Sequence, residues 1–189
     1  MRQIIAFTLI AIFAGQLAAR ADGPTTVPAA DTYSLSPIRI EQLKDSSYLY
    51  LSSQATYADV PNTIQKMMAK LTKQMQPLGL SGIAGAPVIV YRGQTMDPTM
   101  PFSMEFGFPV VDGTKPMGDC KIGKLDSAPA AVTIYTGSMV QFGKAIGEVY
   151  SQLIADGHIP SDTHRERYLY WEDPQSSNNV VMIEILLRN

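Results

Sequence analysis

The chain has 189 residues, 46% of them hydrophobic and 17% charged, and its formal net charge at pH 7 is -2. This length provides one well-buried core, or two small half-domains that share one core. The mildly acidic balance does not attract phosphate backbones, so no nucleic-acid partner is expected, and the single cysteine, Cys120, excludes an internal disulfide.

The N-terminus predicts a secretory signal peptide over residues 1–21. Arg2 precedes the apolar run IIAFTLIAIFAG, and Ala19 and Ala21 form an Ala-x-Ala cleavage pattern. The apolar run is too short for a membrane-spanning helix. We therefore expect cleavage after Ala21, release without a membrane anchor, and a periplasmic or secreted location. The mature chain would carry 13 basic and 17 acidic residues, because Arg2 and Arg20 are removed.

Residues 22–35 predict a flexible leader, since they begin with DGPTTVPAADT, which has no apolar period. The folded domain is expected over residues 36–189. Within it, a shift of about 82 residues places RIEQLKDSSYLYLSS over KIGKLDSAPAAVTIY, and a shift of about 79 places Tyr91 over Tyr170 and Glu105 over Glu184. We interpret this as two pseudo-repeats, residues 36–114 and 115–189.

Each repeat predicts a strand, a helix and a hairpin of two strands, which gives an α+β fold of two β-α-β-β units. The first helix opens with Asp59 and Pro61 and has Ile64, Met67, Met68, Leu71 and Met75 on one face. The second begins near Met139 and ends at Gly157. The strands are expected at 47–52, 87–92 and 102–110 in the first repeat, and at 131–135, 167–172 and 180–187 in the second.

One strand-helix-hairpin unit covers only one face of its sheet with a helix. Two such units would therefore leave a groove between antiparallel sheets, where their uncovered faces meet. In VVMIEILL, side-chain alternation puts Glu184 and Met182 on the face away from the helix. In FSMEFGFPV, the same argument puts Glu105 on the corresponding face, so each repeat directs one carboxylate toward the predicted groove.

A carboxylate among apolar neighbours favours either a bound cation or a role in acid-base chemistry. Aromatic rings in the flanking strands would add cation-π attraction. The expected ligand-binding residues are Glu184, Tyr170, Trp171, Glu105, Tyr91, Tyr135 and Met182. Periodicity alone leaves open which face Tyr170 and Trp171 occupy, and whether Glu105 shares the site.

The second repeat resembles the GyrI-like small-molecule-binding domain, also known as the effector-binding domain of bacterial AraC-type and MerR-type regulators. The resemblance covers residues 38–187 and rests on Pro129 and Ala130, Gly137, Tyr170, the Asp173-Pro174 pair and Glu184. It implies a pair of β-α-β-β modules, with Glu184 as the central ligand-binding carboxylate and Tyr170 as an aromatic wall. The regulators carry a helix-turn-helix before this domain, whereas a signal peptide precedes it here.

We therefore expect an exported protein that binds a small amphipathic or cationic molecule, and more a binding protein than an enzyme. One alternative is a hydrolase of electrophilic, cyclopropane-type toxic compounds that uses Glu184 in the same pocket. Another is a haem-binding or interaction protein, because SOUL-type proteins have a similar fold. His158 and His164 are expected in a surface loop, so neither a metal nor a cofactor is expected. The ligand's identity and the oligomeric state stay open.

Overall fold

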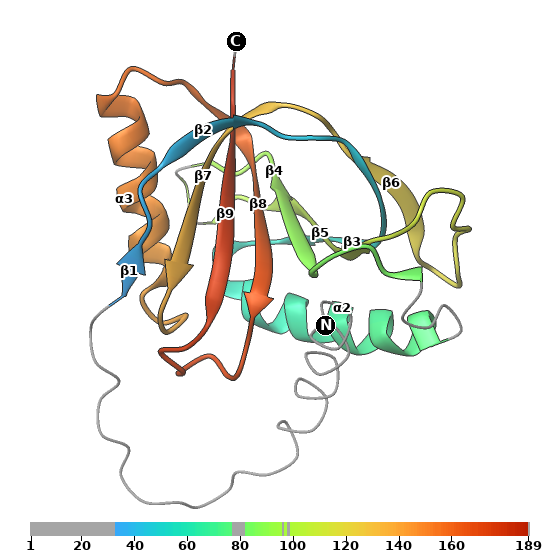
Figure 1. Cartoon of the computed structure of the whole chain (residues 1–189). Helices are drawn as coiled ribbons and strands as arrows, with labels where there is room; N and C mark the ends of the chain where they lie inside the picture. The colour runs from blue at the N-terminus through green and yellow to red at the C-terminus, as the bar shows by residue number, and fades with distance from the viewer. Residues whose placement is uncertain (1–32, 77–81, 96, 98, 189) are drawn as a thin grey trace, which may run out of the picture.

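The computed structural model describes residues 33–76, 82–95, 97 and 99–188 (Figure 1). The predicted signal peptide and residues 22–32 of the leader lie outside the described residues. The end of the leader is ordered, because Ser34–Leu35 forms a short strand, β1. None of the helices in this described part is long and apolar enough to cross a membrane.

The elements follow the predicted strand-helix-strand-strand order in both halves. The first half contains β1 and β2 (Arg39–Gln42), β3 (Ser46–Ala55), the 3-10 turn η2 (Tyr57–Asp59), α2 (Val60–Met75), β4 (Val88–Arg92) and β5 (Phe102–Pro109). The second half contains β6 (Lys121–Leu125), β7 (Pro129–Thr136), α3 (Phe142–Ala155), β8 (Pro160–Tyr170) and β9 (Val180–Leu187). The α+β prediction is confirmed.

Local sequence explains both helices. Pro61 lies in the first turn of α2, where a missing backbone N–H leaves no hydrogen bond unmade, and Met67, Leu71 and Met75 form its buried stripe. The last turn of α3 is closed by Gly157, which has a positive φ of 82°. The backbone N–H of His158 then donates to the carbonyl of Leu153, as expected for a glycine stop.

The described strands form one sheet of nine antiparallel strands in the order β1-β7-β9-β8-β4-β5-β3-β6, with β2 also pairing with β7. We expected a groove between sheets. The two halves instead join edge to edge, because β4 pairs with β8 and so satisfies what would be two open strand edges. The strands before each repeat are exchanged: β2 pairs with β7, and β6 pairs with β3.

Both helices pack on the same face of this sheet. α2 contacts β3 and β5, whereas α3 contacts β7 and β8 (Figure 1). Side chains from both helices and from this face form one continuous core. The apolar sets predicted to lie under the helices are confirmed there: Val181, Ile183 and Ile185 of β9, and Phe102, Met104, Phe106 and Phe108 of β5. Strands β8 and β4 lie side by side in the middle of the sheet, where the two halves join.

Candidate functional site

Strand β8 has charged side chains on both faces of the sheet. We expected this strand to begin at Arg167, but it begins at Pro160. His164 therefore lies in a strand and is only 2% exposed, so the expectation of a surface-loop histidine is wrong. Because side chains alternate, His164, Glu166 and Tyr168 face the helices, while Arg165 and Arg167 face the opposite side.

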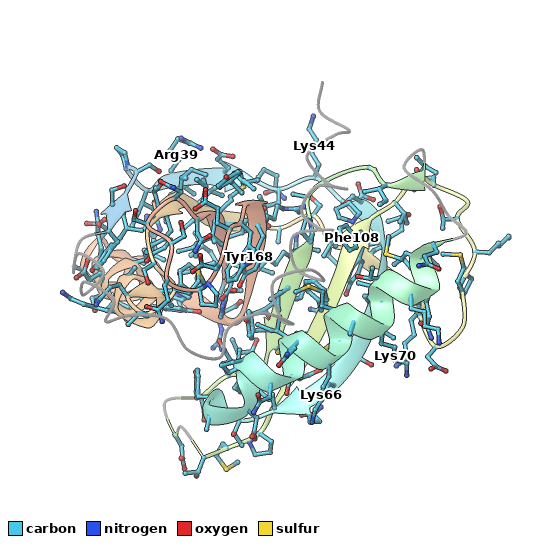
Figure 2. All side chains as sticks on the ribbon, turned by 90° about the horizontal axis from the view of Figure 1, so that it is seen from below. Arg39, Lys44, Lys66, Lys70, Phe108 and Tyr168 are labelled. Atoms are coloured by element: carbon cyan, nitrogen blue, oxygen red, sulfur yellow. The ribbon has the colours of Figure 1, made fainter. Side chains whose placement is uncertain are left out.

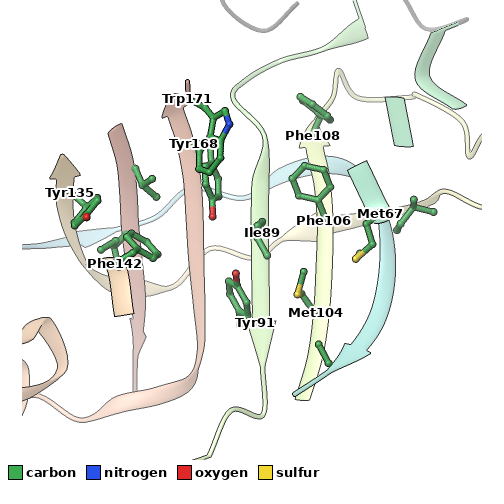
Figure 3. Close-up of a cluster of buried hydrophobic side chains, with 14 of the residues drawn as sticks. Met67, Ile89, Tyr91, Met104, Phe106, Phe108, Tyr135, Phe142, Tyr168 and Trp171 are labelled. Atoms are coloured by element: carbon green, nitrogen blue, oxygen red, sulfur yellow. The ribbon is translucent and has the colours of Figure 1, made fainter. Parts of the chain in front are cut away.

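Glu166 lies at the centre of a cluster on the helix-covered face, which we call the Glu166 cluster (Glu166, His164, Tyr91 and Tyr168). The hydroxyls of Tyr168 and Tyr91 donate to its Oε2 at 2.8 and 3.2 Å, and Nε2 of His164 lies 3.3 Å from its Oε1. Figure 3 shows the two tyrosines extending from β8 and β4 with their hydroxyls directed toward one another. Glu166 is 4% exposed, so these side chains replace its water.

The surroundings of this carboxylate are apolar and aromatic. Its direct cross-strand neighbours are Ile89 of β4 and Ile183 of β9. Tyr91 stacks on the His164 ring with centroids 4.5 Å apart, and Tyr150 of α3 meets the same ring edge-on at 6.5 Å. Trp171 packs edge-on against Tyr168 at 5.6 Å. In Figure 2, Tyr168 lies between the part of the molecule that carries α2 and the part that carries α3.

The tyrosines of the cluster remain protonated donors over a wide pH range. Burial, followed by the nearby Glu166 charge, raises the pKa of both Tyr91 and Tyr168 well above its ordinary value. Burial also raises the pKa of Tyr150 to about 12. The partners of Glu166 in the described structure are thus two neutral hydroxyls and one imidazole. None of the ion pairs found between described residues joins Glu166 to a lysine or an arginine.

Glu184 is on the opposite face, as predicted, and it is also buried. Its Oε1 accepts a hydrogen bond from Nε of Arg167 at 2.5 Å, and its Oε2 lies 4.0 Å from Nη1 of Arg165. Arg165 is fully buried and donates from Nη2 to the backbone carbonyl of Asp126 at 2.8 Å. Burial lowers the pKa of Arg165, and Glu184 opposes that effect. Glu184 therefore has internal cations as partners.

Glu105 repeats this arrangement in the first half. Its Oε2 accepts from the hydroxyl of Tyr48 and lies 3.5 Å from Nη2 of Arg92. Val90 stands opposite Glu105 in the sheet, just as Arg165 stands opposite Glu184. Arg92 and Arg167 each follow two residues later on the same face, so the two ion pairs occupy equivalent positions. By the same register, Tyr91 corresponds to Glu166 and not, as the sequence shift suggested, to Tyr170.

The structure divides the predicted ligand-binding residues between the two faces. Met182, Glu105 and Glu184 share the face away from the helices, whereas Tyr91, Tyr135 and Trp171 belong to the core under the helices. Tyr170 is 41% exposed and donates to Glu172 at 2.7 Å. A register shift between Tyr168 and Tyr170 turns Tyr170 outward and lets Trp171 face inward.

Other possible sites are weaker. No group of three or more His, Cys, Asp or Glu in the described ranges is arranged to hold a metal ion. Two surface hollows border α2, one beside Lys70, Lys73 and Met117 and one beside Ser53 and Lys66. Neither hollow is lined by a residue of the Glu166 cluster.

Comparison with known proteins agrees with this fold. The model of the GyrI-like small molecule binding domain matches residues 36–188. The chain belongs to this family. No curated protein matches the sequence.

Three solved structures show the same GyrI-like fold. The C-terminal domain of EcmrR has a TM-score of 0.64 at 12% identity and covers 82% of this chain and 98% of its own. SAV2435, solved bound to tetraphenylphosphonium, has a TM-score of 0.60 at 12% identity, and the match covers 81% of this chain and 94% of SAV2435. VCH_CASS2, an integron cassette protein from the mobile metagenome of Vibrio cholerae, has a TM-score of 0.56 at 18% identity, with 82% and 99% coverage.

Sequence reasoning missed His164 and Glu166 as functional candidates. The signal was present in THRERYLY, because a strand that includes all of this segment puts His164, Glu166 and Tyr168 on one face by simple alternation. Starting the strand at Arg167 left the first two residues in a loop. A buried Tyr168 would then have implied a buried acid and imidazole beside it.

Proposed function

We propose that this GyrI-like domain binds a small amphipathic or cationic molecule between its two helix-bearing halves, with Glu166 as the central carboxylate. The observation that carries the proposal is that Glu166 is buried and that its contacts are neutral hydroxyls and an imidazole. A buried negative charge without a cationic partner is costly. A ligand that brings a positive charge compensates that cost.

Aromatic rings around the carboxylate suit a lipophilic cation. Tyr91 and Tyr168 hydrogen-bond to Glu166, and their rings belong to an aromatic cluster in which Trp171 packs on Tyr168 and Tyr150 of α3 packs on His164. Each ring face at such a site contributes about 0.5 to 2 kcal/mol of cation-π attraction. The solved neighbour SAV2435 is bound to tetraphenylphosphonium, a large lipophilic cation, and this supports the same ligand class here.

Ligand entry requires covering side chains to rotate aside, because the Glu166 cluster is closely packed. Tyr57 of η2 is exposed and packs on Phe102, whose ring lies 6.0 Å from that of Tyr91. Tyr150 is half-buried at the other side of the cluster. The apparent affinity then equals the intrinsic affinity of the open arrangement multiplied by the fraction of molecules that adopt it.

The test uses Trp171, the single tryptophan, as a fluorescent reporter in the mature protein, residues 22–189. Tetraphenylphosphonium should give a saturable change, and the neutral triphenylphosphine oxide a much weaker one. Glu166→Gln should raise the Kd for the cation at least tenfold, about 1.4 kcal/mol. The matched control is Glu105→Gln on the opposite face, which should bind like the wild type.

The same titration decides between the two faces. If Glu166→Gln binds as tightly as the wild type and Glu184→Gln loses binding while remaining folded, then the site lies on the face away from the helices, which carries Glu184, Glu105 and Met182. If both Glu166→Gln and Glu184→Gln bind the cation like the wild type, a carboxylate-centred cation site in this protein is rejected. Circular dichroism of each variant separates loss of binding from loss of folding.

A second candidate function is hydrolysis of an electrophilic small molecule in the same place. The contact between His164 and Glu166 favours it, because a carboxylate that holds Nε2 of an imidazole leaves Nδ1 to act as a general base. The two functions differ in turnover. A binding protein returns its ligand unchanged, whereas an enzyme releases a product that chromatography detects.

Export is part of the proposal and is tested separately. The pattern that supports it is the apolar run followed by Ala19 and Ala21. Expression of the full chain in a bacterial host should place the protein in the periplasm or medium, with Asp22 as its first residue. A cytoplasmic protein that retains Met1, measured by mass spectrometry, would contradict export.

A further inference from the structure

In the described part of the chain, the sheet ends in two edges that differ in charge. One edge is β6, whose charged residues, Lys121 and Lys124, are both basic. The other edge includes β2, which has the sequence RIEQ and pairs with β7 alone among the described strands. An edge strand that carries only lysines resists pairing with a second copy of itself. Strand β2 instead carries one charge of each sign.

The backbone of β2 directs hydrogen-bonding groups away from the sheet. The N–H of Leu43 donates to the carbonyl of Ala128 of the chain segment that enters β7, in the register that β2 keeps with β7. Hydrogen-bonded pairs alternate along an antiparallel ladder, so Arg39 and Glu41 also bond to β7. The N–H and C=O of Ile40 therefore point outward, where no described strand pairs with them.

The side chains of β2 are also exposed. Ile40 is 49% exposed and lies on the face that the helices cover, because its cross-strand partner Ala131 belongs to the core there. Arg39 and Glu41 lie on the opposite face, where Nε of Arg39 donates to Oε1 of Glu41 at 2.8 Å. An open strand edge with exposed apolar and charged side chains suits the addition of another strand.

We propose that β2 is a dimer interface, in which the β2 strands of two copies pair antiparallel about a twofold axis at Ile40. Each Ile40 N–H then donates to the Ile40 carbonyl of the second copy. Arg39 of each copy stands opposite Glu41 of the other. The proposal concerns an edge of the sheet and is independent of the ligand site at Glu166.

Charge selects this register among those that the backbone allows. Opposite charges directly across a strand pair stabilise it, and like charges destabilise it. The outward-pointing groups stay opposite one another only when the register moves by two residues. Such a move places Arg39 opposite Arg39 in one direction and Glu41 opposite Glu41 in the other. Pairing centred on Ile40 is the arrangement in which both charges of each copy are matched.

The dimer formed in this way is a continuous sheet through both copies. The twofold axis is perpendicular to the sheet, so the helices of both copies lie on the same face. The strand contact itself is short, because β2 has four residues. It covers less than the ~800 Å² per partner of a standard interface. We therefore expect a weak dimer in exchange with the monomer.

The experiment is sedimentation equilibrium of residues 22–189 over about a hundredfold range of protein concentration, chosen for a small interface. The mass should rise from that of the monomer to that of the dimer. Glu41→Arg places an arginine opposite Arg39 of the second copy, and Arg39→Glu places a glutamate opposite Glu41. Each single variant should weaken the dimer at least about tenfold.

Two matched controls restore the charge pairing. The double variant Arg39→Glu/Glu41→Arg again has opposite charges across the axis and should dimerise like the wild type. An equimolar mixture of the two single variants should also dimerise, because the charges of one variant complement those of the other. Ile40→Pro tests the backbone: it removes the N–H that points away from β7, which an edge strand tolerates, and should abolish the dimer.

Each outcome bears on the proposal. A wild-type protein that stays monomeric at every concentration overturns it. A dimer that persists unchanged in the single charge variants and in Ile40→Pro uses another surface and also overturns it. Failure of the mixed single variants to dimerise would show that Arg39 and Glu41 do not face one another. If Ile40→Pro does not fold, the charge variants still decide, because both of these side chains are exposed.

Discussion

Each face of the sheet has a buried carboxylate, and the partners of the two carboxylates differ. Away from the helices, Glu184 is met by Arg167 and Arg165. Under the helices, Glu166 is met by tyrosine hydroxyls and an imidazole. The first carboxylate is neutralised by the protein itself and acts as part of the frame. The second has no lysine or arginine partner among the described residues.

The pseudo-symmetry of the fold strengthens this contrast. The Arg92–Glu105 pair and the Arg167–Glu184 pair occupy equivalent positions in the two halves. On the other face, the position equivalent to Glu166 is Tyr91. An interaction present in both repeats is explained by the needs of the repeat itself. A carboxylate present in one repeat, at the junction of β4 and β8, is better explained by a task of the whole domain.

The largest effect is expected from Glu184→Ala. This change leaves Arg165 and Arg167 without their carboxylate, and the Arg165 side chain is only 1% exposed. Removing one partner of a buried ion pair costs about 3–5 kcal/mol. Urea denaturation should show that loss in the free energy of unfolding. A loss below about 1 kcal/mol would mean that water reaches this face, and the contrast between the two faces would then fail.

Alkaline pH should weaken the helix-covered face next. The pKa of Tyr91 and of Tyr168 is raised in the folded protein, mainly by burial and then by Glu166. Below the pKa of an unfolded tyrosine, about 10, both states are protonated and stability is unaffected. Above it the unfolded state loses protons first, so stability falls by about 1.4 kcal/mol per pH unit for each such tyrosine.

Ultraviolet absorbance of tyrosinate measures this directly. Of the nine tyrosines in the chain, the exposed ones should titrate smoothly. Tyr91 and Tyr168 should appear only in a cooperative step that coincides with unfolding followed by circular dichroism. A smooth titration of every tyrosine in the folded protein would mean that the Glu166 cluster is open to solvent.

Much of the fold could be predicted from the sequence, because its signals are local. Hydrophobic periodicity gave both helices, alternation gave the core face of β5 and β9, and the internal repeat gave the order of elements. The pairing of β4 with β8 could not be predicted in this way, since it joins two distant segments. The role of Trp171 also depended on a register shift after Tyr168, which reverses the alternation at one point.

The candidate site was harder to predict for a related reason. Sequence alternation correctly separated Glu184 from the helix-covered face, but it carries no information about the partners across the sheet. Arg165 and Arg167 reach Glu184 because β8 lies beside β9. Tyr91 reaches Glu166 because β4 lies beside β8 on the other side. A carboxylate's role therefore follows from strand order, which local patterns do not determine.

A smaller loss is expected from Glu105→Gln. The Arg92 and Glu105 side chains are 35% and 14% exposed and lie 3.5 Å apart, so water can solvate a freed Arg92. Partly exposed ion pairs contribute about 1 kcal/mol or less. Urea denaturation should therefore show a loss several times smaller than for Glu184→Ala. Equal losses would show that burial does not set the difference between these two equivalent pairs.

The smallest effect, and the sharpest contrast, is expected from Glu166→Gln. The amide keeps one acceptor oxygen for Tyr91 and Tyr168 and removes a buried charge that has no permanent cationic partner. Binding sites often retain such a charge at the expense of stability. The free energy of unfolding should equal that of the wild type or exceed it by up to about 1 kcal/mol, while cation binding is lost. If urea denaturation instead shows that the free energy of unfolding falls by more than about 2 kcal/mol, Glu166 has a structural role like that of Glu184. The hydrogen bonds from Tyr91 and Tyr168 to the charged carboxylate would then stabilise the fold.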